Sequence, residues 1–361
     1  AFPDKDINEK KNMEPAQDTA PETGMDIRSR MEAARKREEE ENRRNQMAER
    51  KEQNEAMQQV EEDLGHVKKP AKVITVFSAK GGVGKTTIAC ELATFLSLTN
   101  HGKGKFRVCL VDYDLMFGDI LSTLNFNPNQ ANMMDWIADL DKKHKAGQEW
   151  NAISYDAGQI ERFLQKKEES GLYSLIAPIT NFDYMKISNE EIVNLCGTML
   201  RNIVENGDFD FVIVDTGNNI EDATYVSLER ADEILLILTQ SMNSANCNNN
   251  FLNTMNHLEF DLSKIRIVIN KAKPAKGVGI SVNELQEALK NPVTNQPFEC
   301  YAKIKDNDAV QNAENVGEPM VYKSSHEFTK SIGEVAHHVI GDTFVLAKPK
   351  KKRFSFFRKN K

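Results

Sequence analysis

The feature that most constrains the fold is an alternation of continuous apolar runs with segments of helical periodicity. The apolar runs are KVITVFSA (72–79), FRVCLVDYD (106–114), GLYSLIAPI (171–179), FDFVIVDTG (209–217), EILLILTQ (233–240) and KIRIVINK (264–271). Helical patterns are predicted at 87–98 and near 159–168, 189–206, 219–229, 244–258, 281–290 and 328–341. A strand buried on both faces reads as a continuous apolar run, and intervening helices make the crossovers of a parallel sheet. The sequence therefore predicts an α/β fold, with a twisted, mostly parallel sheet covered by helices on both faces.

The charges of the chain are divided among three regions. The net charge of −7 combines −4 over residues 1–69, −11 over residues 70–347 and +8 over residues 348–361. An acidic body with a basic tail is an asymmetry that suggests separate roles for the two parts. The predicted domain organisation is a charged, disordered or helical arm at 1–69, an α/β domain at 70–345 and a basic aromatic tail at 346–361.

The charged arm differs in composition from the body. Residues 1–27 are polar and contain several prolines, so we expect them to be disordered. Residues 28–64 are strong helix formers without Gly or Pro, and no heptad is sustained among them. We expect a solvated charged helix there, and the alternative is a docking segment for a partner.

Cysteine usage and hydropathy exclude several classes of protein. The chain has no C-x-x-C pair, which argues against a structural zinc or iron–sulfur site. We expect reduced, mostly buried thiols at Cys90, Cys109, Cys196, Cys247 and Cys300. No run of 18 or more apolar residues occurs, and the first residues, AFPDKDINEKKN, lack the apolar region of a secretory signal. These features favour a cytoplasmic location.

A glycine-rich segment, SAKGGVGKTT (78–87), follows the first predicted strand and opens the first predicted helix. This strand–loop–helix context is the one in which a phosphate-binding loop is credible. Its glycines allow backbone N–H groups to approach phosphate oxygens, and the helix adds its N-terminal dipole. Lys85 is expected to reach the β- and γ-phosphates, and the Thr86 hydroxyl to bind Mg²⁺. The predicted nucleotide-binding residues of the loop are Gly81, Gly82, Val83, Gly84, Lys85, Thr86 and Thr87.

With its second lysine, Lys80, the motif K-G-G-x-G-K-T resembles that of the deviant Walker A ATPases, the MinD/ParA group within the SIMIBI class of P-loop proteins. The resemblance covers about residues 72–340. It implies an ATP hydrolase that requires ATP and Mg²⁺ and forms an ATP-sandwiched homodimer. It also implies that Lys80 crosses the dimer interface to the partner's nucleotide, so that Lys80 and Lys85 of opposite chains act together as catalytic cations. The alternative for Lys80 is a solvent-exposed lysine beside a glycine turn.

Carboxylates follow two of the apolar runs. Asp112 and Asp114 end the run before LMFGD, and Asp215 ends FDFVIVDTG, a Walker B pattern. Ligands of open α/β sheets bind at the carboxyl ends of strands. By the resemblance, Asp114 orients or deprotonates the attacking water, Asp112 supports Mg²⁺ or the switch region, and Asp215 holds Mg²⁺ through a water. Asp119 belongs to the same loop as Asp114, and the alternative for Asp112 or Asp119 is capping of the next segment. Gly217 stands where the family usually has proline.

The last apolar run contains Asn270, which the resemblance assigns to the adenine edge. A guanine-specific N-K-x-D motif would place Asp at position 273, whereas this chain has Lys273, so adenine is favoured. The alternative for Asn270 is a turn cap. The stretch at 302–319 resembles the family's late segment and is expected to pack beside the adenine. The Asn-rich stretch at 243–251 is interpreted as a helix start rather than as part of the chemistry.

The segment at 112–141 resembles the CpaE/TadZ branch of the family, which positions secretion and type IV pilus machinery, and its Phe117-Gly118-Asp119 fits the pattern of that branch. The branch usually carries a receiver-like N-terminal domain, and residues 1–69 are too short and too charged for one. The resemblance implies an ATPase switch that positions a cellular assembly, either pilus or secretion machinery or a division site. The alternatives are a DNA partition ATPase of ParA type and a nucleotide-dependent scaffold with little hydrolysis.

The tail KPKKKRFSFFRKNK (348–361) combines eight positive charges with three phenylalanines. MinD-like proteins end in a short basic amphipathic helix that binds anionic membrane when the dimer forms. Each cation near such a surface contributes about 1 kcal/mol, and aromatic side chains add burial among the headgroups. Peripheral membrane association is therefore predicted, with nucleic-acid contact or a merely solubilising tail as the alternatives.

Overall fold

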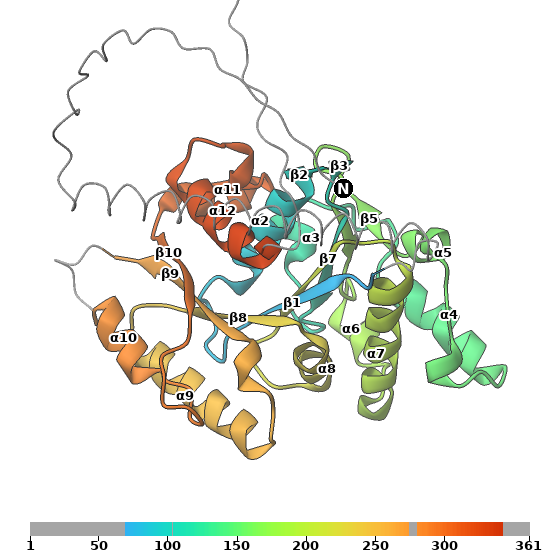
Figure 1. Ribbon diagram of the computed structural model, residues 1–361. Coiled ribbons are helices and arrows are strands. Elements are labelled where there is room, and N and C mark those ends of the chain that lie inside the picture. Colours follow the sequence, from blue (N-terminus) through green and yellow to red (C-terminus); the bar gives the residue numbers. More distant parts are fainter. Residues whose placement is uncertain (1–68, 103, 274–279, 342–361) are drawn as a thin grey trace, which may run out of the picture. The chain divides into compact units, whose positions relative to one another are not determined.

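The computed structural model describes residues 69–102, 104–273 and 280–341 (Figure 1). The charged arm predicted at 1–69, apart from Lys69, and the basic tail predicted at 346–361 lie outside the described residues. Within the described part of the chain, none of the helices combines the length and the apolar character that a membrane crossing requires.

An eight-stranded sheet forms the centre of the fold, in the order β10-β9-β8-β1-β7-β4-β6-β5. Every neighbouring pair is parallel except β5 with β6 at one edge. Its strands are β1 (Lys72–Phe77), β4 (Val108–Tyr113), β5 (Gln165–Lys166), β6 (Tyr173–Leu175), β7 (Phe211–Thr216), β8 (Glu233–Leu238), β9 (Ile265–Ala272) and β10 (Cys300–Lys305). A separate antiparallel pair consists of β2 (Asn100–His101) and β3 (Gly104–Lys105). The predicted fold class is confirmed.

Helices cover both faces of this sheet (Figure 1). On β1, Ile74 and Val76 pack toward one helical layer, whereas Val73 and Phe77 pack toward the other, because successive side chains of a strand point to opposite faces. The first layer contains α2 (Lys85–Leu98), α3 (Ile120–Thr123), α11 (Asp308–Val316), the 3-10 turn η3 (Met320–Tyr322) and α12 (Glu327–Ile340). The second contains α4 (Met133–Lys145), α5 (Ala157–Glu161), α7 (Asn189–Asn206), α8 (Asp222–Arg230), α9 (Met242–His257) and α10 (Val282–Ala288).

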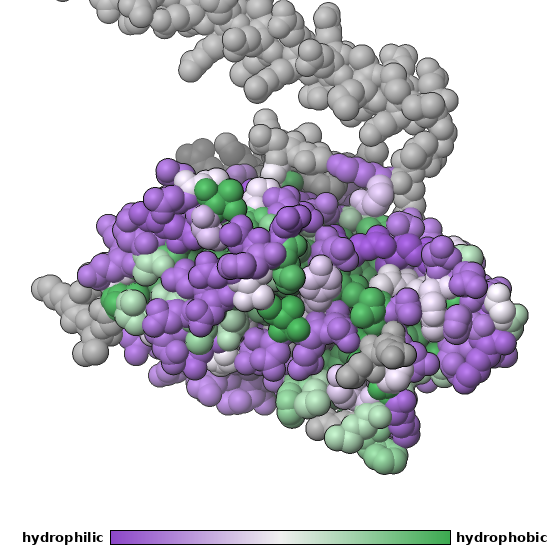
Figure 2. Space-filling model, turned by 90° about the horizontal axis from the view of Figure 1, so that it is seen from below, coloured by the Kyte–Doolittle hydropathy of each residue, from purple (hydrophilic) through white to green (hydrophobic). Residues whose placement is uncertain are grey.

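The helices of the second layer are amphipathic. On α7 the buried side chains are Ile192, Leu195, Met199, Leu200 and Ile203, a spacing that puts them on one stripe of the helix. The outward surface on this side of the molecule is mainly hydrophilic (Figure 2). The short elements α6 (Asn181–Tyr184), η1 (Trp150–Ala152) and η2 (Leu262–Lys264) complete the fold.

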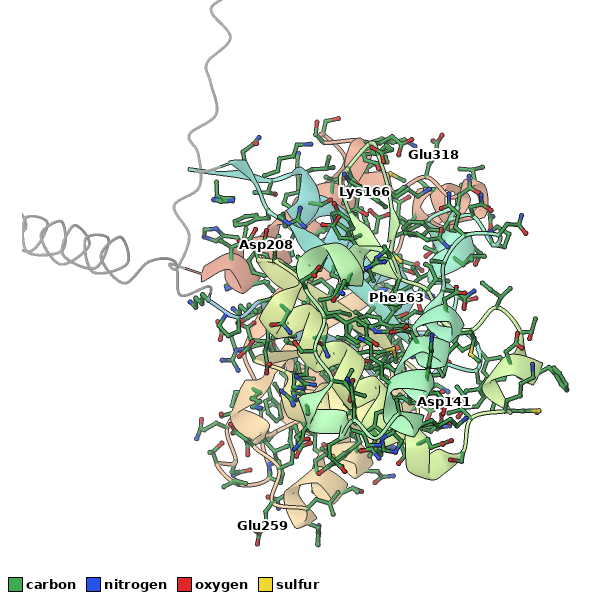
Figure 3. All side chains as sticks on the ribbon, turned by 90° about the vertical axis from the view of Figure 1, so that its right-hand side faces the viewer. Asp141, Phe163, Lys166, Asp208, Glu259 and Glu318 are labelled. Carbon is green, nitrogen blue, oxygen red and sulfur yellow. The ribbon has the colours of Figure 1, made fainter. Side chains whose placement is uncertain are left out.

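The edges of the sheet depart from the expected elements. The helix predicted near 159–168 ends at Glu161, and the chain continues into edge strand β5. The buried amide of Gln165 fixes this edge by donating hydrogen bonds to the carbonyl oxygens of Asn127 and Ala131, each at 3.0 Å. Phe163, which precedes β5 and is labelled in Figure 3, stacks on Trp136 of α4 with ring centroids 5.1 Å apart.

Strand β10 at the opposite edge was not predicted. In its sequence, CYAKIK, the exposed Lys303 separates buried Ala302 from buried Ile304, and the exposed Lys305 ends the strand, so the strand shows no continuous apolar run. An edge strand needs only one buried face and one paired side, and it therefore lacks the pattern that revealed the central strands.

Candidate nucleotide-binding site

The glycine-rich loop joins the end of β1 to the start of α2 in the predicted strand–loop–helix arrangement. Gly82 and Gly84 have φ values of 72° and 93°, a region that favours glycine. A Cβ at Gly84 would also lie only 2.5 Å from Nδ2 of Asn270. Gly84 is the N-cap of α2, where no side-chain cap bond occurs, and the first turn of α2 contains no acidic residue. The helix N-terminus therefore offers its N–H groups to an anion.

The register of the sheet places two buried carboxylates side by side beneath α2. Asp112 on β4 pairs directly with Asp215 on the neighbouring strand β7. The residues two positions earlier, Leu110 and Ile213, pack in the layer that includes α2, so both carboxylates project toward the same side. Both side chains are fully buried. The two carboxylates therefore lie together at the carboxyl ends of their strands.

The two carboxylates differ in their hydrogen bonds. Asp112 accepts bonds from the backbone N–H groups of Asp114 and Ile120, each at 3.3 Å. Ile120 is the first residue of α3, so Asp112 does cap the following segment, as the alternative interpretation has it. Both oxygens of Asp215, in contrast, make no hydrogen bond of ordinary geometry with the residues that the structure describes, although the Thr86 hydroxyl and the Thr216 N–H lie near enough to lower its pKa. An unpartnered buried carboxylate is costly unless a cation or donor completes it.

The electrostatics of the site follow from burial. Burial raises the pKa of Asp215 to about 7, and the Thr86 hydroxyl and the Lys85 ammonium oppose this increase. The pKa of Asp112 is raised well above its ordinary value by burial and by the like charges of Asp215 and Asp114. Burial lowers the pKa of Lys85, while Asp215 and Asp114 act in the opposite direction. An additional cation would relieve the charge on this cluster.

The donor atoms fit Mg²⁺. Asp215 offers two unpartnered oxygens, and the hydroxyl of Thr86 lies close enough to influence its pKa. Mg²⁺ prefers oxygen ligands and keeps several waters, so it needs few protein groups when phosphate oxygens are also present. Over the described ranges, no group of three or more His, Cys, Asp or Glu side chains forms a metal cage. This arrangement suits a cation shared with a nucleotide rather than a structural metal ion.

The loop after β4 folds tightly onto the same site. Oδ1 of half-buried Asp114 accepts a bond of 3.2 Å from the N–H of Phe117, and a Cβ at Gly217 would lie 3.7 Å from Cγ of Asp114. A Cβ at Gly118 would lie 2.6 Å from Oδ2 of Asp112, so only glycine fits there without a shift. Asp119 is the N-cap of α3 but makes no side-chain cap bond, and it is exposed. The structure therefore brings Asp114 and Asp112 to the site and leaves Asp119 at its outer edge.

The predicted partner-contacting lysine lies at the entrance of the loop. The backbone N–H of Lys80 donates to Oγ of Ser78 at 3.2 Å, and its side chain is half-buried. Among the described residues, its ammonium takes part in no ion pair. Lys85, in contrast, faces the carboxylates of its own chain. The two lysines of the motif are thus in different environments.

Asn270 lies against the loop at the end of β9. Its buried side chain donates to the carbonyl oxygen of Val83 at 2.9 Å. A cavity of about 160 Å³ opens beside it, lined by Thr87 and Asn270 together with residues 271, 305–308, 310, 311, 314 and 328. The structure therefore brings the late segment at 302–319 next to Asn270, and its packing beside an adenine stays a prediction. Within the cavity wall, the Thr87 hydroxyl donates to the carboxylate of Glu314.

One residue of the site's surroundings was missed by sequence reasoning. Asn248 belongs to the Asn-rich stretch at 243–251, whose composition predicts only a helix start, and α9 begins just before this stretch, at Met242. Its fully buried side chain accepts a bond of 3.1 Å from the N–H of Ala79, next to Lys80. A run of asparagines does not indicate which of them faces inward. The one available signal is that this helix follows the carboxyl end of a strand, where the site lies.

Comparisons with known proteins show which family and which relatives this chain resembles. Residues 71–267 match the model of a protein family described as AAA domain. The septum site-determining protein MinD of Thermotoga maritima is 23% identical over 276 residues, which cover 75% of this chain and 88% of that protein.

Solved structures share the fold. A ParA family ATPase from Chlorobium tepidum TLS superposes with a TM-score of 0.59 and 24% identity, covering 73% of this chain and 98% of that one. The septum site-determining protein MinD of Pyrococcus horikoshii OT3, complexed with Mg-ADP, has a TM-score of 0.56 and 15% identity, covering 74% and 96%. Because the family match spans more than half of the 361 residues, the chain belongs to the AAA domain family, and it has the fold of the MinD/ParA-type P-loop ATPases.

Proposed function

We propose that this chain is a Mg²⁺-dependent ATPase that dimerises on binding ATP and uses hydrolysis to ADP and phosphate to position another cellular assembly. The observation that carries the proposal is the meeting of a two-lysine phosphate loop with the paired carboxylates of Asp112 and Asp215. The names of the similar proteins, which include MinD and a ParA family ATPase, support the same class of function.

Each group of the site has a role in this proposal. The loop N–H groups and Lys85 bind the phosphates, and Asn270 recognises the adenine edge. Thr86 and Asp215 would hold Mg²⁺, with Asp112 supporting them, and the metal would supply neutralisation of phosphate charge. Asp114 holds the attacking water and accepts its proton.

Lys80 reaches the nucleotide of a second copy in this proposal. Several large apolar side chains that follow the carboxyl ends of β4, β6 and β8 are exposed. They are Phe117, Phe182, Met185 and Met242, with exposed fractions of 66%, 71%, 73% and 50%. In this proposal, these exposed apolar side chains at the carboxyl end of the sheet belong to a surface that becomes covered. A second copy placed over this edge would cover them and bring its own Lys80 to the site.

The test is a comparison of dimerisation and phosphate release. With ATP and Mg²⁺ we expect the unaltered chain to sediment as a dimer, and with ADP as a monomer. Lys80→Ala should still bind ADP but release phosphate roughly a thousandfold more slowly, by analogy with the loss of a charge-stabilising finger. The exposed Lys105 of β3 provides a matched control, since Lys105→Ala removes the same charge away from the loop. If Lys80→Ala released phosphate at the rate of the unaltered chain, the proposal that Lys80 acts in the partner's nucleotide site would be contradicted.

The assembly that is positioned is proposed from the sequence. The resemblance of 112–141 to the CpaE/TadZ branch favours pilus or secretion machinery, and the tail at 348–361 favours an anionic membrane surface. The test is co-sedimentation with anionic vesicles, comparing ATP with ADP and the full chain with one ending at Ala347. Binding that requires both ATP and the tail supports a membrane switch. Its absence, together with DNA-stimulated turnover, would favour the ParA-type partition function instead.

A further inference from the structure

A buried asparagine ties α9 to the backbone just before Lys80. Oδ1 of Asn248 accepts the bond from Ala79 N–H at 3.1 Å, and its Nδ2 donates to the carbonyl oxygen of Ser244 at 2.8 Å within α9. Nδ2 also lies 3.5 Å from Oγ of Ser78, at the limit of a hydrogen bond. Asn248 and Ser78 are both fully buried. The asparagine is thus held on its own helix and presents its remaining groups to the loop.

These bonds continue to Lys80 itself. Oγ of Ser78, next to Asn248, accepts the N–H of Lys80 at 3.2 Å. Two consecutive backbone N–H groups, those of Ala79 and Lys80, are therefore fixed by side chains that contact each other. The backbone direction at this point determines where the Lys80 side chain leaves the loop. Hydrogen bonds of buried, mutually supporting groups rigidify a segment more than isolated ones do.

The neighbouring loop residues do not depend on this network. Lys85 and Thr86 lie on α2, which is held by its own helical bonds and begins after Gly84. The carbonyl oxygens of Val83 and Gly82 are held by Asn270 and Lys271 of β9 instead. The loop thus has two supports: β9 holds the part at Gly82 and Val83, and α9 holds the part at Ala79 and Lys80.

We propose that Asn248 is a positioning residue that aims Lys80 across the dimer interface while leaving the nucleotide pocket of its own chain unaffected. The inference rests on the proposed role of Lys80 in the partner's site. It assigns α9 a function in hydrolysis although none of its side chains is placed against the nucleotide. A positioning role of this kind reduces turnover without reducing nucleotide affinity, because the affected group acts only in the assembled dimer.

The experiment measures steady-state phosphate release at saturating ATP and Mg²⁺, and ADP affinity by fluorescence titration, on the full chain. We expect Asn248→Ala to lower kcat by about ten- to a hundredfold, the factor that corresponds to losing one or two buried hydrogen bonds. ADP affinity should change by less than about twofold, since the ADP-binding half of the loop has its own support. Ser78→Ala is a second, smaller change that removes the acceptor of Lys80 N–H, and we expect the same pattern.

Two comparisons separate positioning from a structural effect. Combining Asn248→Ala with Lys80→Ala should give the kcat of Lys80→Ala alone, because a side chain that is absent cannot be misdirected. Asn249→Ala is the matched control, since the Asn249 side chain bonds to the carbonyl oxygen of Ala288 on α10, away from the loop. It should leave kcat unchanged.

The outcomes distinguish this inference from the proposed function. If Lys80→Ala retains full kcat, both the shared site and the positioning role are overturned. If Lys80→Ala loses activity while Asn248→Ala and Ser78→Ala retain it, only the positioning role is overturned. A loss of ADP affinity parallel to kcat, or additive losses in the double variant, would also overturn it, because both indicate general damage to the fold.

Discussion

Replacing Gly84 by alanine tests how the loop and β9 are fitted together. An alanine at φ 93° would be strained by about 1–2 kcal/mol. Its Cβ would also lie 2.5 Å from Nδ2 of Asn270, which would have to move away from the carbonyl oxygen of Val83. Leaving that buried acceptor without its bond costs about 1–3 kcal/mol. We therefore expect Gly84→Ala to lower the free energy of unfolding by about 2–5 kcal/mol.

The control is Gly82→Ala in the same loop. Gly82 has a φ of 72°, and nothing lies within 4 Å of a Cβ built on it, so only the strain applies. Both changes also reduce the entropy of the unfolded chain equally, so that this contribution cancels in the comparison. Urea unfolding without nucleotide should show Gly84→Ala to be the less stable variant by about 1–3 kcal/mol. Equal losses would refute the reasoning, because the contact of Asn270 would then contribute nothing.

Three further predictions concern other parts of the molecule. Glu91 is buried and accepts bonds from Met320 and Val321, yet burial raises its pKa to about 7. Because its folded-state pKa lies above the unfolded value, Glu91 contributes stability that is present at low pH and lost as the pH rises toward and through 7. Between about pH 5 and 8, the free energy of unfolding of the unaltered chain should therefore fall by about 2–3 kcal/mol more than that of Glu91→Gln. The same dependence of the free energy of unfolding on pH in both proteins, measured by urea unfolding, would contradict this. ADP alone should raise the melting temperature of Asp215→Asn as it does for the unaltered chain, but adding Mg²⁺ to ADP should raise it no further. A further rise with Mg²⁺ in this variant would exclude Asp215 as a metal ligand. Trp136→Ala, which empties a fully buried site, should destabilise the chain by about 3–5 kcal/mol in urea unfolding, and a loss below about 1 kcal/mol would show that the site collapses.

Much of the fold could be predicted from sequence because the central strands are buried on both faces. The runs at 72–79 and 209–217 contain β1 and β7 at the middle of the sheet, where every residue of the two strands except Lys72 is buried. The prediction failed at the edges. Strand β10 is interrupted by lysines, and β5 is held by the amide of Gln165, whose partners lie more than 30 residues away along the chain. Edge strands are defined by such contacts rather than by their own composition.

The sequence by itself determined the phosphate loop and the acidic strand ends. These are local patterns, since a glycine turn before a helix and an Asp after an apolar run need no distant residue to be recognised. Only the tertiary structure decided which of these groups meet. The register of β4 against β7 sets Asp112 beside Asp215 from positions 103 residues apart, and the packing of α9 turns Asn248, among several similar asparagines, toward the loop. Strand register and helix orientation depend on the burial of whole faces, and a short stretch of sequence does not contain that information.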